Sequence, residues 1–525
     1  MKNTNRHLIA SVIFLTAIAW FLFYYYLYPY HQFHKEQTLL FLYSADALQA
    51  YATRPACLAR LAGDFLTQFY YYAPVAALVA AAVAAATGWL SYQLLRRGSP
   101  DWIAGTAAWL LMNWEMLRFS GLTYPLASSL SLLAGLGLYL LYRTLKNQSW
   151  RIAGSIAAVA AGYYLFGYGV YVFALAVLLQ AATEKKAGTA TLLIPLLCLA
   201  LPPLVGARQG LTLSQAYGYP ATGWWDIPDL THERLLGLDT ESYLGHWKKV
   251  KELSRPDCSI NAVTYYYNLA NAAEGRLCDG LLDRQDPNIQ GLFLPVSAQS
   301  SYLSTLFAAE GWFRLGDMTM AEHATLLGLI FSPNHQGTRM LKRLAEINLI
   351  NGDEAAALKY LRILSKTHFY RQWAAARLAG QETEEVKKWL AAQRKHIPRE
   401  DTLRTSTTDI VKSLRHLLRA NPQNEMARDY LLCFHLLTKN IPGFLEDYLP
   451  EPGKAPRRLY AEALLIGLVQ RKATSEEIEK TIVDPQIMQA FKAYTQMHRQ
   501  YRGSPSALTA RFGKTYWFYY HYASI

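Results

Sequence analysis

The division between apolar and polar composition constrains this chain more than any other feature of its sequence. Up to about Ala207 the chain is overwhelmingly apolar and rich in Ala, Leu, Val and Tyr, whereas from Arg208 onward it has the composition of an ordinary soluble protein. Apolar stretches of about 20 residues are long enough to cross a bilayer as helices. The sequence therefore predicts a transmembrane domain over residues 1–208 and a soluble domain over residues 209–525.

The apolar part contains a series of candidate membrane spans. His7 to Tyr28 follows the basic residues Lys2 and Arg6 and has no small-residue cleavage site after it, so we interpret it as an uncleaved span and not as a signal peptide. The other candidate spans cover residues 70–95, 102–117, 122–141, 152–180 and 189–205. Between the first two spans lies a polar, partly amphipathic segment, residues 31–68, which we expect to form a long outer loop.

The stretch from Ile152 to Gln180 can form one long span or two short helices that turn near Gly167. One span gives six crossings and leaves the soluble domain in the cytoplasm. Two helices give seven crossings, and every basic cluster then falls on the cytoplasmic side, as the positive-inside rule prefers. These clusters are Lys2 and Arg6, Arg96 and Arg97, residues 143–151, and Lys185 and Lys186. Seven crossings predict an inner-membrane protein whose soluble domain lies in the periplasm or another extracytoplasmic space.

The soluble part contains helix pairs with a repeating pattern. Three stretches each show an apolar helical face, a glycine and a second helical pattern: residues 265–282, 303–333 and 341–366. The glycines at the turns are Gly275, Gly316 and Gly352. The interval between the last two is close to the tetratricopeptide period of about 34 residues. Since no stretch shows a convincing alternating strand pattern, the fold is predicted to be all-α: a polytopic helical bundle of six or seven spans followed by a soluble tetratricopeptide-like repeat domain.

Three positions in this part bear on its surface. Trp312 occupies the aromatic position of the repeat and is a candidate binding residue, whereas Phe369 stands where the repeat consensus has its closing proline. The aromatic segment at residues 512–522 is expected to pack on the last helices or on the membrane part, with an interfacial anchor or a ligand surface as the alternative.

The chain resembles an uncharacterised family of bacterial multi-pass membrane proteins with a tetratricopeptide-like tail. The resemblance rests on "KEQTLLFL" at residues 35–42, "GDFLTQFYY" at residues 63–71, "NLANAAEGRL" at residues 268–277 and "FGKTYWFYYHY" at residues 512–522. It covers most of the chain and implies an architecture without an assigned activity.

A weaker resemblance is to the C-type glycosyltransferases, which take sugars from polyprenyl-phosphate carriers. It rests on the layout of seven spans, a long first outer loop and a soluble outer domain, and no diagnostic motif accompanies it. The resemblance implies a catalytic carboxylate in the loop, where Glu36, Asp46 and Asp64 are the only acids. It also implies a lipid-linked sugar as substrate, with Arg54 and Arg60 available to its phosphate.

These loop residues also have ordinary structural explanations. Glu36 can be a solvated carboxylate or a partner for Lys35, and Arg54 and Arg60 can anchor an interfacial helix among lipid headgroups.

Two further sets of polar residues invite a functional interpretation. His31 and His34 would share one face of a helix, which a metal could use, but no third strong ligand is evident, so we predict no metal site and no cofactor. Glu115 lies in the third span three residues before Arg118, and we expect a paired or snorkelling carboxylate there.

The formal net charge of +13 would suggest an acidic partner in a soluble protein. Much of the excess flanks apolar segments and the chain has no nucleic-acid recognition motif, so we predict no nucleic-acid partner. In an oxidising compartment Cys258 and Cys278 could form a disulfide, and two separate buried thiols are the alternative.

Two functions remain open from the sequence. The first is a non-enzymatic envelope protein whose membrane bundle anchors a helical-repeat platform for a protein or peptide partner. The second is a C-type glycosyltransferase or a degenerate relative.

Overall fold

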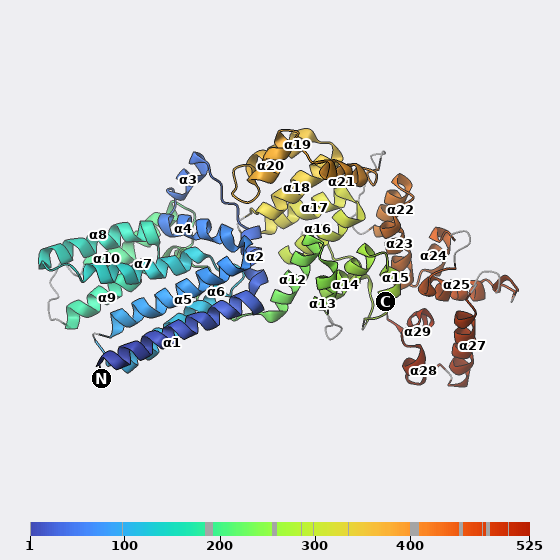
Figure 1. The fold of residues 1–525 in the computed structure, drawn as a ribbon, viewed down its shortest axis with the longest axis horizontal. Coiled ribbons are helices and arrows are strands. Elements are labelled where there is room, and N and C mark those ends of the chain that lie inside the picture. Colours follow the sequence, from blue (N-terminus) through green and yellow to red (C-terminus); the bar gives the residue numbers. More distant parts are fainter. Residues whose placement is uncertain are drawn as a thin grey trace. The chain divides into compact units, whose positions relative to one another are not determined.

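The computed structural model is all-helical throughout the residues that it describes, with helices joined by turns and no strands (Figure 1). The described residues are 2–96, 98–183, 193–254, 260–284, 286–297, 299–333, 335–398, 409–450, 455–474, 476–478, 484–501 and 503–524. The predicted all-α fold is confirmed for this part of the chain.

The chain divides into two compact units. The first unit comprises Met1–Glu233, Ser332–Lys342 and Lys359–Gly380. The second comprises Arg234–Phe331, Arg343–Leu358 and Gln381–Ile525. Three separate segments of the chain therefore make up the first unit, whereas a division by hydropathy places one continuous segment there.

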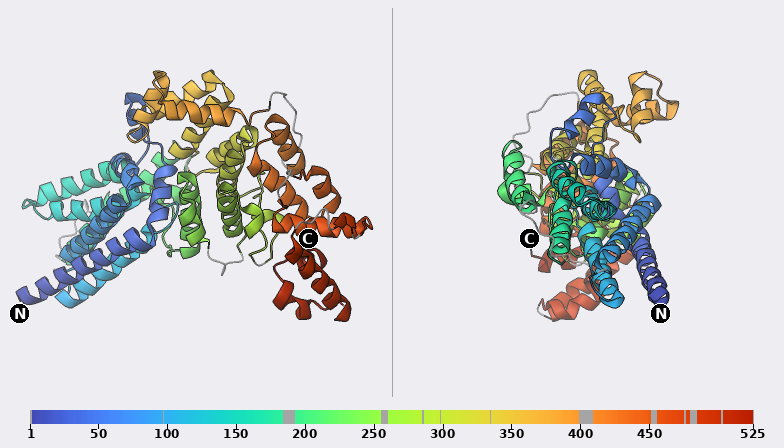
Figure 2. Two further views of the ribbon diagram at one scale, coloured as in Figure 1. Left: turned by 45° about the vertical axis from the view of Figure 1, so that its right-hand side comes forward. Right: turned by 90° about the vertical axis from the view of Figure 1, so that its left-hand side faces the viewer.

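A bundle of apolar helices makes up most of the first unit. Its helices are α1 (Lys2–Leu22, continued by the π-helical turn η1, Phe23–Leu27), α5 (Ala73–Leu95), α6 (Asp101–Phe119), α7 (Leu126–Tyr142), α8 (Gln148–Phe166), α9 (Gly169–Thr183) and α10 (Leu193–Ala207). Helices α1, α5 and α6 lie side by side, as Figure 2 also shows. The buried face of α5 consists mostly of Ala, Gly, Ser and Thr residues, and such small side chains allow close helix packing.

Two of these helices are long and apolar enough to cross a membrane, namely the segments Asn5–Leu27 and Ala73–Leu95. Shorter apolar helices are Leu126–Tyr142, Gly169–Ala181, Leu193–Ala207 and Met318–Phe331. Between α8 and α9 the helix breaks at Gly167, whose φ of +78° favours glycine. Of the two alternatives for residues 152–180, the structure has the pair of short helices.

The segment between the first two candidate spans, residues 31–68, which we expect to be an outer loop, is mostly helical. It contains α2 (Pro29–Gln37), α3 (Ala45–Tyr51) and α4 (Cys57–Thr67), and the 3₁₀ turn η2 (Gln68–Tyr71) leads into α5. A Cβ atom on Gly63 would lie 2.6 Å from the backbone nitrogen of Ala127. Helix α4 therefore packs closely against the bundle through this glycine.

Helix pairs build the second unit and continue into the parts of the first unit beyond residue 331. Residues after the bundle form α11 (Leu213–Gly218), α12 (Leu230–Leu244), α13 (Trp247–Leu253), α14 (Asn261–Ala273), α15 (Leu277–Gly280), η4 (Ile289–Gly291), α16 (Tyr302–Leu315), α17 (Met318–Phe331), α18 (Thr338–Asn351), α19 (Glu354–Leu364), α20 (Arg371–Leu378) and α21 (Glu384–Arg394). Gly275, Gly316 and Gly352 have φ values of +69°, +90° and +80° at the turns where they were expected.

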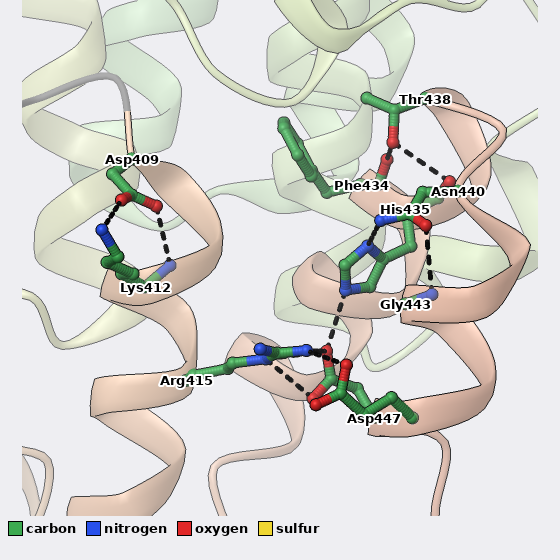
Figure 3. Close-up of polar contacts among 10 residues, drawn as sticks. Asp409, Lys412, Arg415, Phe434, His435, Thr438, Asn440, Gly443 and Asp447 are labelled. Atoms are coloured by element: carbon green, nitrogen blue, oxygen red, sulfur yellow. Dashed lines mark hydrogen bonds and ion pairs between the residues drawn. The ribbon is translucent and has the colours of Figure 1, made fainter.

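The C-terminal part of the second unit contains α22 (Ile410–Ala420), α23 (Glu425–Leu437), α24 (Ile441–Asp447), α25 (Arg458–Gln470), α27 (Pro485–Gln500), α28 (Pro505–Phe512) and α29 (Tyr516–Tyr522). A polar network ties α22, α23 and α24 together around Asp447, as Figure 3 shows. The carboxylate of Asp447 accepts two hydrogen bonds from Arg415, at 2.9 and 3.0 Å, and lies 2.8 Å from Nε2 of His435.

The aromatic C-terminal helix α29 packs on earlier helices of the same unit. Tyr516 and Trp517 are fully buried. The Tyr516 hydroxyl donates to the carbonyl of Leu436 at 2.9 Å, and the Trp517 indole donates to the carbonyl of Glu462 at 3.0 Å. These contacts agree with the expectation that this segment packs on the last helices.

Candidate functional site

Helix α2 concentrates polar side chains in the interior of the first unit. Pro29 occupies its first turn, where a missing N–H costs nothing. Six of its nine residues are buried: His31, Gln32, His34, Lys35, Glu36 and Gln37. Charged side chains are rarely buried without a partner, so a short helix with this composition is a candidate site.

The N-terminal end of α2 is held by a carboxylate from far along the sequence. Glu233 accepts hydrogen bonds from the backbone N–H groups of Tyr30 and His31, at 2.7 and 2.9 Å, and lies 2.6 Å from Nδ1 of His31. Nε2 of His31 lies 3.0 Å from the hydroxyl of Tyr28. Burial raises the pKa of Glu233 to about 8 and lowers the pKa of His31 to about 3. The pair therefore caps the helix with little net charge at neutral pH.

Lys35 is buried, and no carboxylate among the described residues forms an ion pair with it. Its Nζ donates to the carbonyl of Phe119 at 2.7 Å and lies 4.9 Å from the centre of the Phe119 ring. Burial lowers the pKa of Lys35 to about 7. The side chain lines a cavity of about 70 Å³ whose polar walls also include Thr38, Asp64, Thr67, Thr123 and Tyr124.

Glu36 is enclosed on the other side of α2. It is 2% exposed, and the hydroxyl of Tyr370 donates to its two oxygens at 3.3 and 3.4 Å. Burial raises the pKa of Glu36 to about 8, so the carboxyl is mainly protonated at neutral pH. The adjoining cavity of about 10 Å³ has room for about one water molecule. Glu36 is thus neither a solvated carboxylate nor the partner of Lys35, and both of those explanations were wrong.

The structure brings together some of the other candidate residues. Asp64 accepts a hydrogen bond of 2.8 Å from the hydroxyl of Tyr51, and its pKa is raised by burial. The guanidinium of Arg60 lies 5.3 Å from the Tyr51 ring, which places Arg60, Tyr51 and Asp64 in one cluster. Asp46 and Arg54 are exposed on and after α3 and do not join this cluster.

Trp312, the candidate binding residue of the second unit, lies in the interior of that unit. It is 4% exposed, and its ring centroid is 4.9 Å from that of Phe293. The side chain therefore contributes to the packing of α16 and is covered from solvent.

The predicted pairing of Glu115 with Arg118 is confirmed, with 2.9 Å between Oε2 and a guanidinium nitrogen. Tyr124 and Ser129 also donate to the Glu115 carboxylate, at 2.7 and 2.5 Å. The Arg118 guanidinium lies 4.4 Å from the ring of Trp114. Through these contacts the buried pair connects α6 to α7, which is a structural role.

Several expectations concern cysteines, lysines and metals. Cys278 is a buried free thiol that accepts a hydrogen bond of 3.4 Å from Arg457, and Cys258 lies outside the described residues. Lys185 and Lys186, which bear on the number of crossings, also lie outside them. Among the described residues, no group of three or more His, Cys, Asp or Glu side chains could hold a metal ion.

The sequence does not predict the residues that complete the site, because they come from distant segments of the chain. Glu233 is 202 residues from His31, and Tyr370 is 334 residues from Glu36. Arg339 adds a hydrogen bond of 3.2 Å to the side chain of Gln37. The one available signal was the departure from the repeat consensus at Phe369, since this ring stacks on Tyr71 at 4.8 Å. Segments 332–342 and 359–380 therefore belong structurally to the unit that contains α2.

The comparisons with known proteins give one match. A model described as "Family of unknown function (DUF6057)" matches residues 4–523. No curated protein and no solved structure matches the chain.

Proposed function

Because the chain belongs to DUF6057, a family of unknown function, we propose its function from the structure alone: a multi-pass membrane protein of the cell envelope that presents a helical-repeat platform to a protein or peptide partner. The observation that carries the proposal is the combination, in one chain, of a bundle of apolar helices with consecutive helix pairs that turn at glycine.

Seven crossings are supported by the way in which the helix ends meet in the first unit. The hydroxyl of Tyr24, at the end of the first apolar segment, donates to the carbonyl of Met116 near the end of α6 at 2.7 Å. The start of α7 lies against Gly63. The end of α8 contacts the residues before α4, where the Ala56 N–H donates to the carbonyl of Tyr163 at 3.4 Å. The helix ends that meet at this side of the bundle alternate along the chain, and the break at Gly167 makes α8 and α9 two separate crossings, which favours an odd total.

The basic residues gather at the opposite ends of the same helices. The guanidinium of Arg6 lies 5.6 Å from the ring of Trp89, near the end of α5. Arg143, just after α7, donates to the carbonyl of Gln93 at 3.3 Å. By the positive-inside rule this end faces the cytoplasm, which directs the residues after Ala207 to the extracytoplasmic side. Helices α9 and α10, with 15 residues each, are only about 22 Å long and would sit within the bundle or in a locally thinned bilayer.

The platform is supported by exposed apolar residues of α17. On α17, Leu326 and Ile330 are 37% and 54% exposed and lie one turn apart on one face. An exposed apolar stripe on a helical repeat is a suitable surface for a peptide or a helix.

Topology is tested on the full chain with reporters at its C-terminus. A phosphatase that is active only outside the cytoplasm should be active there, and a fluorescent protein that matures only in the cytoplasm should stay dark. The reverse pattern would refute the seven-crossing arrangement and leave a cytoplasmic platform.

Partner binding is tested by photocrosslinking in cells. A photoreactive amino acid at Leu326 or Ile330 should give a discrete crosslinked species. The matched control is Glu384, an exposed residue on α21 of the same unit. Equal crosslinking from all three positions, or none from Leu326 and Ile330, would refute a specific surface on α17.

A second proposal, transfer of a sugar from a lipid carrier, is favoured by one observation only. Asp64 and Lys35 line the same cavity of about 70 Å³, whereas Glu36 is enclosed and protonated. Asp64 is then the candidate base and Lys35 the candidate phosphate ligand. Abolished transfer in Asp64→Asn, with normal expression and retained activity in Asp46→Asn, would support this proposal. Unchanged phenotypes in both variants would remove it.

A further inference from the structure

Helix α4 has an apolar face that the described residues of the first unit leave partly exposed. Its buried face consists of Cys57, Ala59, Gly63 and Thr67. On the other face, Leu58 and Phe65 are 45% and 40% exposed, with exposed Ala62 between them. These three positions follow one another at helical intervals of four and three residues, so they form a continuous apolar stripe along the helix.

The position of α4 along the chain limits where this stripe can lie. Only the 3₁₀ turn η2 and Tyr72 separate α4 from α5, which is one of the two helices long enough to cross a membrane. Four residues of 3₁₀ helix rise about 8 Å, so the end of α4 lies about that far from the start of α5. The headgroup region on each side of the hydrocarbon core is about 5–7 Å thick. The Phe65 end of the stripe is therefore close to the depth at which α5 enters the apolar layer.

Helix α4 packs against the start of α7 and the end of α8. Gly63 fits against the first turn of α7, and α4 also packs on α8. Ring contacts connect the stripe to the residue before α5, since Phe65 packs on Phe69 and Phe369 packs on both Phe69 and Tyr72, with ring centroids 5.5 to 5.9 Å apart. Tyr72 and the α5 residue Leu78 are 50% and 60% exposed. The exposed Arg54, just before α4, supplies a cation at the edge of this surface.

We propose that α4 is an interfacial helix whose Leu58–Ala62–Phe65 stripe inserts into the lipid leaflet, with Arg54 at the level of the phosphates. The inference rests on the proposed membrane integration of α5. Its physical basis is that transfer of an apolar stripe from water into the membrane interface is favourable in free energy, while a neighbouring arginine remains with the headgroups. Lipid is favoured over a protein partner because ring contacts connect the stripe to Tyr72, which directly precedes α5.

Fluorescence quenching of the full chain in lipid nanodiscs tests the inference. A fluorescent amino acid is placed at position 58 or 65, with position 78 on α5 as the lipid-facing control and position 384 on α21 as the water-facing control. One quencher is a phospholipid with a nitroxide on its acyl chain, and the other is aqueous iodide.

We expect loss of fluorescence at positions 58 and 65 with the nitroxide lipid, comparable to the loss at position 78, and little loss with iodide. Quenching by iodide alone would mean that the stripe faces water, and quenching by neither would mean that protein covers it. Either result, with position 78 still quenched by lipid, overturns the inference and leaves the proposed function intact. If position 78 also escapes the nitroxide lipid, membrane integration of α5 itself is refuted.

Discussion

Replacement of Glu36 by Gln should stabilise the protein at alkaline pH and leave it nearly unchanged at acidic pH. Gln has almost the same shape as protonated Glu and can still accept the hydrogen bond from Tyr370. Glu36 is 2% exposed, and no cation that could compensate an ionised carboxylate contacts it within the described residues. Ionisation of the buried group therefore opposes folding, whereas the glutamine cannot ionise.

The sign and size of the effect follow from the pKa of Glu36. Burial raises this pKa from 4.5 to about 8, so the folded state holds a proton that the unfolded chain has lost between these pH values. The wild-type protein consequently loses stability as the pH rises from about 4.5 to about 8. At 1.36 kcal/mol for each tenfold change, the loss is at most roughly 5 kcal/mol, because water entry or relaxation would reduce it.

The assay is thermal unfolding of wild type and Glu36→Gln in nanodiscs at pH 5 and pH 8.5, followed by circular dichroism. The unfolding midpoints should agree at pH 5, and at pH 8.5 the variant should unfold at a temperature higher by up to on the order of 10 °C. Glu384→Gln, which changes a largely exposed carboxylate, should behave as wild type at both pH values. Equal midpoints of wild type and Glu36→Gln at pH 8.5 would refute the buried, protonated state of Glu36.

Three further substitutions test local packing, each against a matched control in unfolding measurements. Asp447→Asn should lower the free energy of unfolding by about 1–3 kcal/mol, because it weakens the bonds to Arg415 and His435 (Figure 3). Asp409→Asn is the control and should have no measurable effect, because its partner Lys412 is 82% exposed. Equal losses in the two variants would contradict the network. Gly352→Ala, with open space around the new Cβ, should cost about 1–2 kcal/mol for its positive φ. Gly316→Ala should lower the free energy of unfolding more than Gly352→Ala does, because its Cβ would lie 2.6 Å from that of His396. Equal losses of stability in the two variants would show that this close approach is absent. Gly63→Ala should lower stability by about 1–3 kcal/mol because its Cβ would meet the backbone of Ala127. The control Gly137→Ala on α7, with no atom near the new Cβ, should leave stability unchanged or raise it slightly. Unchanged stability in Gly63→Ala would refute the close packing of α4 against α7.

Local sequence signals anticipated the helices of this protein well. The glycines at 275, 316 and 352 end helices at positive φ because only glycine adopts that conformation without strain. Gly167 marked one of two alternatives for residues 152–180, and the structure has the helix break there. These features depend on residues within one or two helical turns of each other, and so they can be recognised without knowledge of the tertiary structure.

The properties of the candidate site depend on contacts between residues that are far apart in the sequence. The segment "HQFHKEQ" is polar, and nothing within it indicates that Glu233 caps the first turn of a helix there or that Tyr370 encloses Glu36. The same carboxyl group is ionised in water and mainly protonated in this interior, because burial removes the solvation of its charge. Likewise, Trp312 fits a repeat position in the sequence, and only packing against Phe293 makes it an interior residue.

The sequence by itself determined where the helices form, because helix length, apolar periodicity and glycine turns are local properties of the chain. The tertiary structure decided which polar groups of residues 31–68 are buried and which are exposed. It also decided that residues 332–342 and 359–380 join the unit that contains α2. Burial and the pKa changes that follow from it are set by neighbours hundreds of residues away, and only the folded chain brings those neighbours together.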